Sequence, residues 1–210
     1  VGIAAFFNYL MLCQMRYTIS FFICFSLLAH GQINHPLNVN LSDLFDQQKW
    51  VDSVYQSLSL EEKVGQLFMP MVFTEKDSLH YIQTMELVKQ HKIGGLVFSL
   101  GSPVEQSKWL NKFQSEAKTP LLIAMDAEWG VAMRLDSVQA FPWPMTLGAI
   151  KDSLLLRKIG RRMAEQEKRL GINYSFGPVL DINTNPKNPI IGNRSFGSSM
   201  ERVTSHALAV

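Results

Sequence analysis

The fold is decided by two short apolar stretches, Ile93-Gly94-Gly95-Leu96-Val97-Phe98 and Pro120-Leu121-Leu122-Ile123-Ala124-Met125. Each is a nearly continuous apolar run of strand length, which is the pattern of a strand buried on both faces. The residues between them, from Pro103 to Lys118, have a helical pattern, with proline at a position that the first turn of a helix tolerates. Buried strands separated by helices indicate a parallel sheet that helices cover.

The same alternation extends on both sides of these stretches. Upstream, Ser59-Leu60-Glu61-Glu62 places a serine three residues before a glutamate, a capping box that opens a helix. That helix would carry Leu60, Val64, Leu67 and Phe68 on one side. The other predicted elements are a helix from about Gln47 to Ser57, a strand within Met69–Phe73, a helix over Asp77–Lys92, a helix over Asp152–Leu170 stopped by Gly171, a strand over Ile172–Phe176 leading into Pro178–Asp181, and a last helix that begins near Ser199 and continues to the end of the sequence.

The first residues have the pattern of an export signal. From Met15 onward, Arg16 is a short basic region, Ile19–Leu28 is an apolar core, and Ala29-His30-Gly31 has small residues where an export peptidase reads. An apolar core of about ten residues is too short for a bilayer, which needs about 20. The alternative is one anchor helix that includes the apolar block before Met15, and it would bury Arg16 in the membrane.

We therefore predict a cleaved signal over residues 1–31, with Val1–Gln14 lying before the translation start. A polar linker follows over 32–46 and a folded domain over 47–210. The protein is then expected to be exported to the periplasm or the extracellular space, without a membrane span after cleavage.

Two folds fit the alternation of predicted strands and helices: a (β/α)₈ TIM barrel and an open doubly wound sheet. No G-x-G-x-x-G follows any predicted strand, which disfavours a dinucleotide-binding sheet. Asp126 and Asp181 each follow a predicted strand, where barrel enzymes place their chemistry. We therefore expect the α/β barrel. Because a complete barrel takes about 250 residues, we expect only its N-terminal portion here, with three or four strand–helix units.

The composition excludes several classes of partner. Twenty Lys and Arg against 18 Asp and Glu give a net charge of +2, so no bulk charge attracts nucleic acid or a lipid surface. Two basic pairs, Arg161-Arg162 and Lys168-Arg169, lie on one predicted helix and are expected to form a solvated face.

Metal and thiol chemistry also find no support. Both cysteines, Cys13 and Cys24, fall inside the signal segment, so no disulfide, thiol nucleophile or cysteine metal site is expected in the mature part. The five histidines lack metal-ligand spacing, and His80 and His91 are expected on solvated helix surfaces. We predict no metal and no organic cofactor.

The segment Asp126-Ala127-Glu128-Trp129-Gly130, followed by Arg134, could hold a sugar. Carboxylates accept hydrogen bonds from hydroxyls, and an aromatic ring covers the apolar face of a pyranose. Alternatively, Glu128 and Arg134 pair to stiffen the loop while Trp129 packs, and the spacing leaves both interpretations open. Asp126 and Glu128 are not assigned as the two carboxylates that cleave a glycosidic bond, because neighbours at i and i+2 need not face opposite sides of a sugar.

Three further residues are candidates with competing structural roles. Trp143, in the proline-framed turn Phe141–Met145, could line a pocket or pack under a loop. Asp181 could act on substrate or tie a loop through backbone N–H groups. Arg194, in a loop rich in Gly and Asn, offers a fork of donors to a hydroxyl or to a neighbouring carboxylate.

Taken in order, these segments resemble the N-terminal domain of glycoside hydrolase family 3, and most of all its β-N-acetylhexosaminidase branch. The resemblance covers about Trp50 to Val210, and Trp129 departs from it because many members have glycine there. It rests on Lys63-Val64-Gly65-Gln66-Leu67-Phe68, Ile93-Gly94-Gly95-Leu96, Asp126-Ala127-Glu128-Trp129-Gly130 with Arg134, Pro178-Val179-Leu180-Asp181 and Ile191-Gly192-Asn193-Arg194-Ser195-Phe196-Gly197.

The resemblance implies a carbohydrate substrate and a retaining mechanism with a covalent glycosyl-enzyme intermediate. It implies that Asp126 and Arg194 hold hydroxyls of the sugar in the −1 subsite and that Arg134 supports that pocket. Asp181 would shape its loop. The nucleophile and the acid/base are expected beyond Val210, so no catalytic residue is assigned.

Three alternatives to an N-acetylhexosaminidase stay open. A β-glucosidase or β-xylosidase of the same family is the first, because recognition of a 2-acetamido group is not visible in these residues. A non-catalytic sugar-binding remnant is the second. An unrelated phosphate-binding barrel enzyme is the third.

Overall fold

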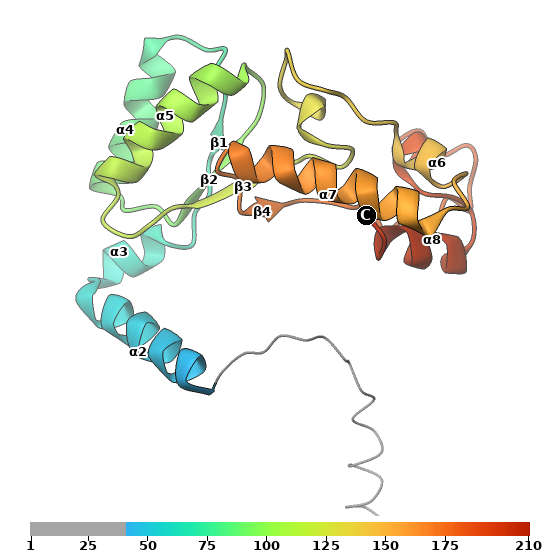
Figure 1. Ribbon diagram of the computed structural model, residues 1–210. Coiled ribbons are helices and arrows are strands. Elements are labelled where there is room, and N and C mark those ends of the chain that lie inside the picture. The colour runs from blue at the N-terminus through green and yellow to red at the C-terminus, as the bar shows by residue number, and fades with distance from the viewer. Residues whose placement is uncertain (1–40) are drawn as a thin grey trace, which may run out of the picture. The chain divides into compact units, whose positions relative to one another are not determined.

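The computed structural model describes residues 41–210, so the predicted signal segment lies outside the described residues. The chain divides into two compact units, Val1–Lys49 and Trp50–Val210. The elements, shown in Figure 1, are α2 (Leu41–Ser57), α3 (Leu60–Gly65), β1 (Met71–Val72), α4 (Ser78–Gln90), β2 (Gly95–Phe98), α5 (Pro103–Glu116), β3 (Leu122–Met125), η1 (Val131–Met133), α6 (Pro144–Leu147), α7 (Ser153–Arg169), β4 (Tyr174–Ser175), η2 (Gly192–Arg194) and α8 (Met200–Ala207).

The four strands form one parallel sheet in the order β1-β2-β3-β4. Each strand pairs with the next one along the chain, whereas a doubly wound sheet reverses its strand order at a switch point. Sequential parallel order is how the strands of a (β/α)₈ barrel begin. The sheet therefore supports the predicted barrel over the open sheet.

The glycine pair at the start of β2 lets backbone segments approach closely. A Cβ added at Gly94 would lie 2.0 Å from the carbonyl oxygen of Gln66. One added at Gly95 would lie 2.3 Å from the carbonyl oxygen of Leu122 on β3. Any side chain here would push α3 and β3 away from β2, so the strand begins with two residues that have none.

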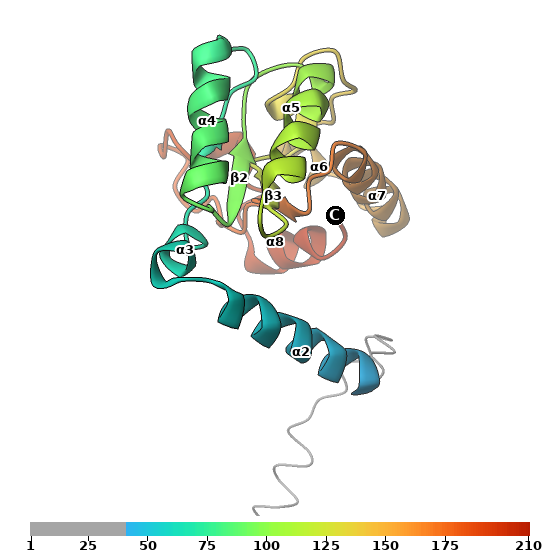
Figure 2. The same cartoon turned by 90° about the vertical axis from the view of Figure 1, so that its left-hand side faces the viewer.

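The main core lies between the sheet and the helix pair α4 and α5, which pack side by side (Figures 1 and 2). Both helices begin at side chains that cap their first turns, Asp77 for α4 and Ser102 for α5. Buried side chains from the two layers fill this core: Val72, Leu96, Phe98, Ile123 and Met125 from the strands, with Val88, Leu110 and Phe113 from the helices.

A second, smaller cluster joins α6, α7 and α8. Leu147, Leu156, Phe196 and Val203 are its buried members. The ring of His206 on α8 lies 3.0 Å, through Nε2, from the carbonyl oxygen of Ile150 just after α6. This cluster anchors the long loop after β4, because Phe196 belongs to that loop.

Most predicted elements are confirmed, and their ends are set by local signals. The Ser59–Glu62 capping box is present. Gly171 has φ +72, the left-handed conformation that stops α7. Two boundaries are wrong. The helix predicted from about Gln47 begins at Leu41, and the last helix ends at Ala207 instead of continuing to the end of the sequence.

Two other expectations from the pattern are wrong. The helix of the capping box ends at Gly65, so Leu67 and Phe68, expected on one side of it with Leu60 and Val64, lie beyond the helix. The segment Pro178–Asp181 is not strand, because β4 ends at Ser175. Asp126 follows β3 directly, as predicted, whereas Asp181 lies further along the loop.

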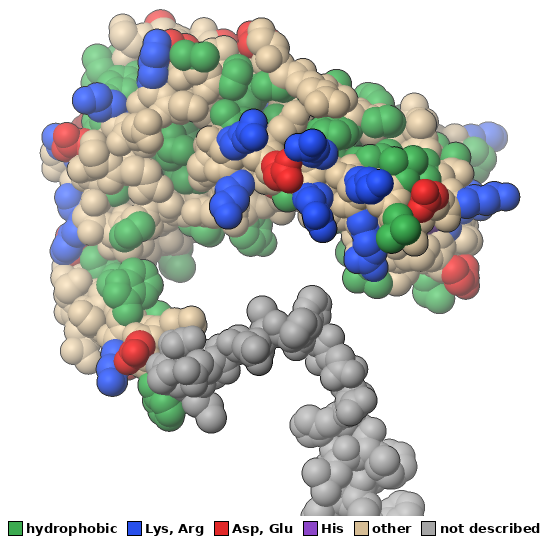
Figure 3. All heavy atoms as spheres, in the orientation of Figure 1, with side chains coloured by type: hydrophobic (Ala, Val, Ile, Leu, Met, Phe, Trp, Pro, Cys, Tyr) green, Lys and Arg blue, Asp and Glu red, His purple; other side chains and the backbone are tan. Residues whose placement is uncertain are grey.

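The surface of α7 agrees with the prediction of a solvated basic face. Arg161, Arg162, Lys168 and Arg169 are all exposed, and Lys and Arg side chains gather over this helix in Figure 3. Arg162 pairs with Glu165 on the same helix at 2.7 Å. Within residues 41–210, no helix combines the length and the hydropathy that a membrane crossing requires.

Candidate functional site

The loop after β3 carries the first charged pair of the site. Asp126 is the first residue beyond the strand, and Arg134 follows the short helix η1. The Arg134 guanidinium donates through Nη2 to the Asp126 carboxylate and through Nε to the Asp126 backbone oxygen at 3.1 Å. The Asp126 side chain remains 37% exposed. Arg134 therefore holds a carboxylate that can still accept hydrogen bonds from a ligand.

The second charged pair joins two loops that are far apart in sequence. Arg194, at the end of η2, donates through Nε to both carboxylate oxygens of Glu128, at 2.8 and 3.1 Å, and through Nη2 at 2.5 Å. The Glu128 side chain is 2% exposed and the Arg194 side chain 34%. A carboxylate this deeply buried needs a paired cation, and the planar fork of arginine supplies it.

The electrostatics of Arg194 bring a third carboxylate to the site. Hydrogen bonding to Glu128 raises the pKa of Arg194, although burial opposes that rise. The negative charges of Asp126 and Asp181 raise this pKa further. Three carboxylates and two guanidinium groups therefore share the carboxyl end of the sheet, and Arg194 stays charged.

Ser195 fixes the loop that delivers Arg194. Its fully buried hydroxyl donates to the backbone oxygen of Asp181 at 2.5 Å and accepts from the N–H of Gly197 at 3.2 Å. The N–H of Asn183 donates to the backbone oxygen of Gly197 at 2.9 Å. These hydrogen bonds join the part of the loop around Asp181 and Asn183 to the part around Ser195 and Gly197.

Two tryptophans lie in the segment between β3 and α6. Trp129 follows Glu128 in the chain, and its ring stacks on Trp143 with centroids 4.2 Å apart and planes 17° apart. Trp143 is 45% exposed. Trp143 therefore packs against another ring and is also exposed, although the sequence analysis treated packing under a loop and lining a pocket as alternatives.

The structure brings together the three residues predicted to bind substrate, Asp126, Arg134 and Arg194. Of the pairings left open by the sequence, Glu128–Arg134 does not form: Arg134 binds Asp126, and Arg194 binds Glu128. The sequence alone did not distinguish these pairings, since either arginine could pair with either carboxylate.

The histidines give one further correction. His80 was expected to be solvated, but it is partly buried and its Nε2 accepts the N–H of Phe73 at 3.1 Å. Burial lowers the pKa of His80, and this agrees with the neutral ring that such an acceptor requires. His91 is exposed, as predicted. Across residues 41–210, no three His, Cys, Asp or Glu side chains gather in a way that could hold a metal ion.

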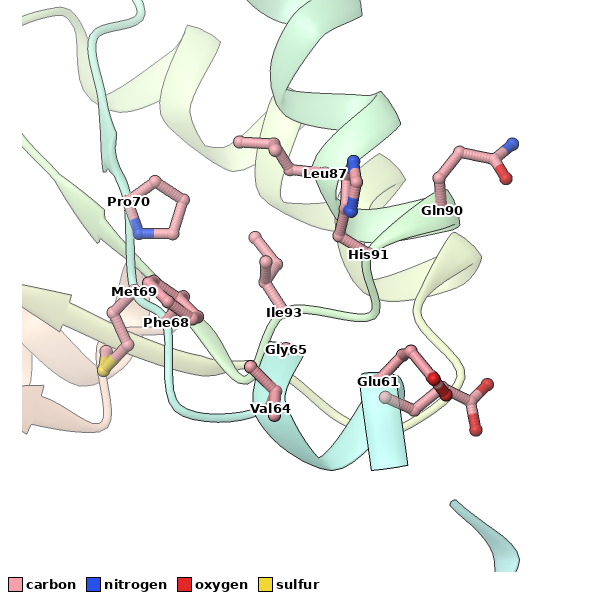
Figure 4. A pocket seen from close by; sticks show the side chains of 11 residues that line it. Glu61, Val64, Gly65, Phe68, Met69, Pro70, Leu87, Gln90, His91 and Ile93 are labelled. Atoms are coloured by element: carbon pink, nitrogen blue, oxygen red, sulfur yellow. The ribbon is translucent and has the colours of Figure 1, made fainter. Parts of the chain in front are cut away.

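An apolar pocket of about 450 Å³ lies at the other end of the sheet (Figure 4). Pro70 and Ile93, two of its lining residues, precede β1 and β2, so it borders the amino ends of the strands. In barrel enzymes the chemistry lies at the carboxyl ends, and the amino-terminal face contributes to stability. We therefore take the charged cluster at the carboxyl ends as the functional site.

A parallel sheet of sequential strands, covered by helices and carrying its charged cluster at the carboxyl ends, defines a barrel protein of the α/β class. Residues 59–210 match the sequence profile of the glycosyl hydrolase family 3 N terminal domain. The chain belongs to this family, and its fold is of the family's TIM-barrel type.

Individual relatives agree with this membership. A "Beta-N-acetylglucosaminidase/beta-glucosidase" of Cellulomonas fimi is 28% identical over 157 residues, which cover 74% of this chain and 27% of that protein. A solved β-N-acetylglucosaminidase of family 3 from Paenibacillus sp. str. FPU-7 has TM-score 0.64 and 34% identity, over 72% of this chain and 30% of that one. "Beta-glucoside phosphorylase BglX bound to 2FGlc" has TM-score 0.71 and 27% identity, over 78% and 29%. The chain spans about a quarter of the length of the Cellulomonas relative.

Proposed function

We propose that the complete protein is a retaining glycoside hydrolase that removes terminal β-linked N-acetylhexosamine, from cell-wall or chitin-derived glycans. The observation that carries this proposal is the meeting of Asp126, Arg134 and Arg194 at the carboxyl end of the sheet. Membership of family 3 and the two similar proteins named as N-acetylglucosaminidases support it.

Each of the three residues has a distinct part in substrate binding. Asp126 is exposed enough to accept hydrogen bonds from two sugar hydroxyls, and Arg134 holds its carboxylate in a fixed orientation. Arg194 is partly exposed and directs its remaining donor capacity at a sugar oxygen while Glu128 holds the guanidinium in place. We assign binding to these side chains and leave the bond-breaking step unassigned.

The test is hydrolysis of an aryl N-acetyl-β-glucosaminide by the complete protein. We expect Asp126→Ala to lower kcat/KM by about 100-fold, since a charge-assisted hydrogen bond contributes about 1.5–3 kcal/mol and Asp126 makes at least one. Asp136→Ala, at an exposed aspartate of the same segment, is the matched control and should change kcat/KM by less than about twofold. Equal rates for Asp126→Ala and the wild type would overturn the site assignment.

A glucosidase is the second candidate, because the Cellulomonas relative is named for both activities. The same assay with an aryl β-glucoside and an aryl β-xyloside decides between them through kcat/KM ratios. Sugar binding without turnover of any of the three substrates would favour a non-catalytic role. The stereochemistry of the first-formed product, followed by NMR, tests the retaining mechanism.

We also propose that the protein is exported, on the basis of the signal pattern in residues 1–31. The expected mature N-terminus lies close to Gln32. Mass spectrometry of the protein purified from the extracellular or periplasmic fraction of its source measures it. A cytoplasmic protein that retains the apolar segment would contradict export.

A further inference from the structure

We propose that the free face of Trp143 is a platform for the second sugar of the substrate, the one that leaves when the terminal sugar is removed. This inference rests on the proposed function, because an enzyme that removes a terminal sugar treats every later sugar as leaving group. It concerns a pair of rings, Trp129 and Trp143, that the charged site does not use.

Two independent connections place Trp143 beside the charged site. Trp143 stacks on Trp129, which follows the buried Glu128 directly. Trp143 is also the residue immediately before α6, and α6 packs against η2, which ends with Arg194. The indole is therefore connected to the two loops that carry the partners of the Glu128–Arg194 pair, through Trp129 to one and through α6 to the other.

The ring is held rigidly and left accessible. Trp129 covers one face of the Trp143 indole, with the planes 17° apart, while 45% of Trp143 remains exposed. Pro142 and Pro144 flank it, and each proline fixes its own φ and restricts the residue before it. A rigid aromatic surface binds with little loss of conformational entropy.

The surroundings favour a neutral, carbohydrate ligand. The segment from Ser137 to Ile150, which carries the ring, contains no charged residue. One face of a pyranose presents C–H groups, which pack on an indole, while the hydroxyls at its rim stay in water. The polar pairs at Asp126 and Arg194 suit the hydroxyls of the first sugar, and the indole beside them suits the apolar face of the next.

The test compares two substrates in the complete protein: N,N′-diacetylchitobiose, which has a second sugar, and methyl N-acetyl-β-glucosaminide, which has none. Trp143→Ala should raise KM for the disaccharide about tenfold, as expected for one lost stacking contact, and leave KM for the methyl glycoside within about twofold. Trp143→Phe should recover most of the loss, because a smaller aromatic face remains. Equal changes for both substrates, or none, would overturn the platform.

Trp50→Ala is the matched control, since Trp50 is exposed on α2. A binding measurement separates this inference from the proposed function: calorimetric titration with a thio-linked, non-cleavable analogue of the disaccharide. Weaker binding by about tenfold in Trp143→Ala, and not in Trp50→Ala, supports the platform even if the wild type cleaves no substrate. An analogue that the wild type does not bind, or binds equally in all variants, overturns it.

Discussion

The loop after β3 closes on itself, whereas the loop after β4 reaches back to the β3 loop. The Asp126–Arg134 pair joins residues eight apart in sequence, and the Glu128–Arg194 pair joins residues 66 apart. The first pair is partly exposed on both sides, while the second contains a carboxylate that is 2% exposed. One pair shapes a single loop, and the other forms only when two loops are assembled.

This difference separates two kinds of energetic contribution. An exposed pair gains little, because water solvates both charges well when they separate. A buried carboxylate that loses its partner keeps the full cost of its desolvation. The Glu128–Arg194 pair should therefore matter to folding, and the Asp126–Arg134 pair mainly to the geometry that a ligand meets.

The largest effect is expected from Arg194→Ala. Because it leaves the buried Glu128 carboxylate without a partner, the free energy of unfolding should fall by about 3 kcal/mol. Urea denaturation of the full chain at pH 7, followed by circular dichroism, measures it. Arg162→Ala removes an exposed pair with Glu165 and should cost less than about 1 kcal/mol. A similar loss in both variants would mean that Glu128 is solvated.

A smaller effect on stability is expected from Arg134→Ala. The Asp126 carboxylate is 37% exposed, so water can replace the guanidinium, and the free energy of unfolding should fall by about 1 kcal/mol. Activity should respond more strongly, because Asp126 loses the contact that orients it. Comparing kcat/KM with the urea midpoint for the same variant separates the two effects. A loss of stability as large as that of Arg194→Ala would contradict the contrast between the pairs.

The coupling between the two pairs should be smaller again. The charge of Asp126 helps to raise the pKa of Arg194, so the two residues interact although each has another partner. A double-mutant cycle with Asp126→Asn and Arg194→Ala should give a coupling of about 0.5 kcal/mol in the free energy of unfolding. Strict additivity would show that the two pairs are electrostatically independent.

The smallest effect concerns pH and lies outside both pairs. Burial lowers the pKa of His80, so the unfolded chain binds a proton more readily than the folded one. Stability from this residue is therefore complete above the ordinary histidine pKa and is lost as the pH falls towards the folded pKa. Acidification from pH 7 to 5 should destabilise the wild type more than His80→Gln, by less than about 1 kcal/mol. Urea midpoints at the two pH values provide the measurement, and identical pH responses would contradict it.

Most secondary structure could be predicted because its signals are local. Capping side chains such as Ser59 and Asp77 bind backbone N–H groups a few residues away, so the residues that start a helix lie next to it in the sequence. The buried strands could be found from their apolar runs. The end of the capping-box helix could not: Leu67 and Phe68 continue its apolar pattern, yet α3 ends at Gly65.

It could be predicted which residues gather at the carboxyl end of the sheet, but not which of them pair with one another. Asp126, Arg134 and Arg194 were found from residue types at strand ends and from a family resemblance. Whether Glu128 pairs with Arg134 or with Arg194 depends on how closely the loop after β4 approaches the loop after β3. The packing of Phe196 in the second cluster and the hydrogen bond from Ser195 to Asp181 fix the position of that loop. The spacing of residues in the sequence does not show how close the two loops lie in the folded chain.

The stacked indoles also make the site optically visible. The protein has four tryptophans, of which Trp109 packs among aromatic rings in the main core region and Trp50 lies on α2. Trp143 is exposed to water and stacks on Trp129, with the ring centroids 4.2 Å apart. A sugar that covers Trp143 would shift the emission of this pair to shorter wavelength, so intrinsic fluorescence reports occupancy of the platform without any label.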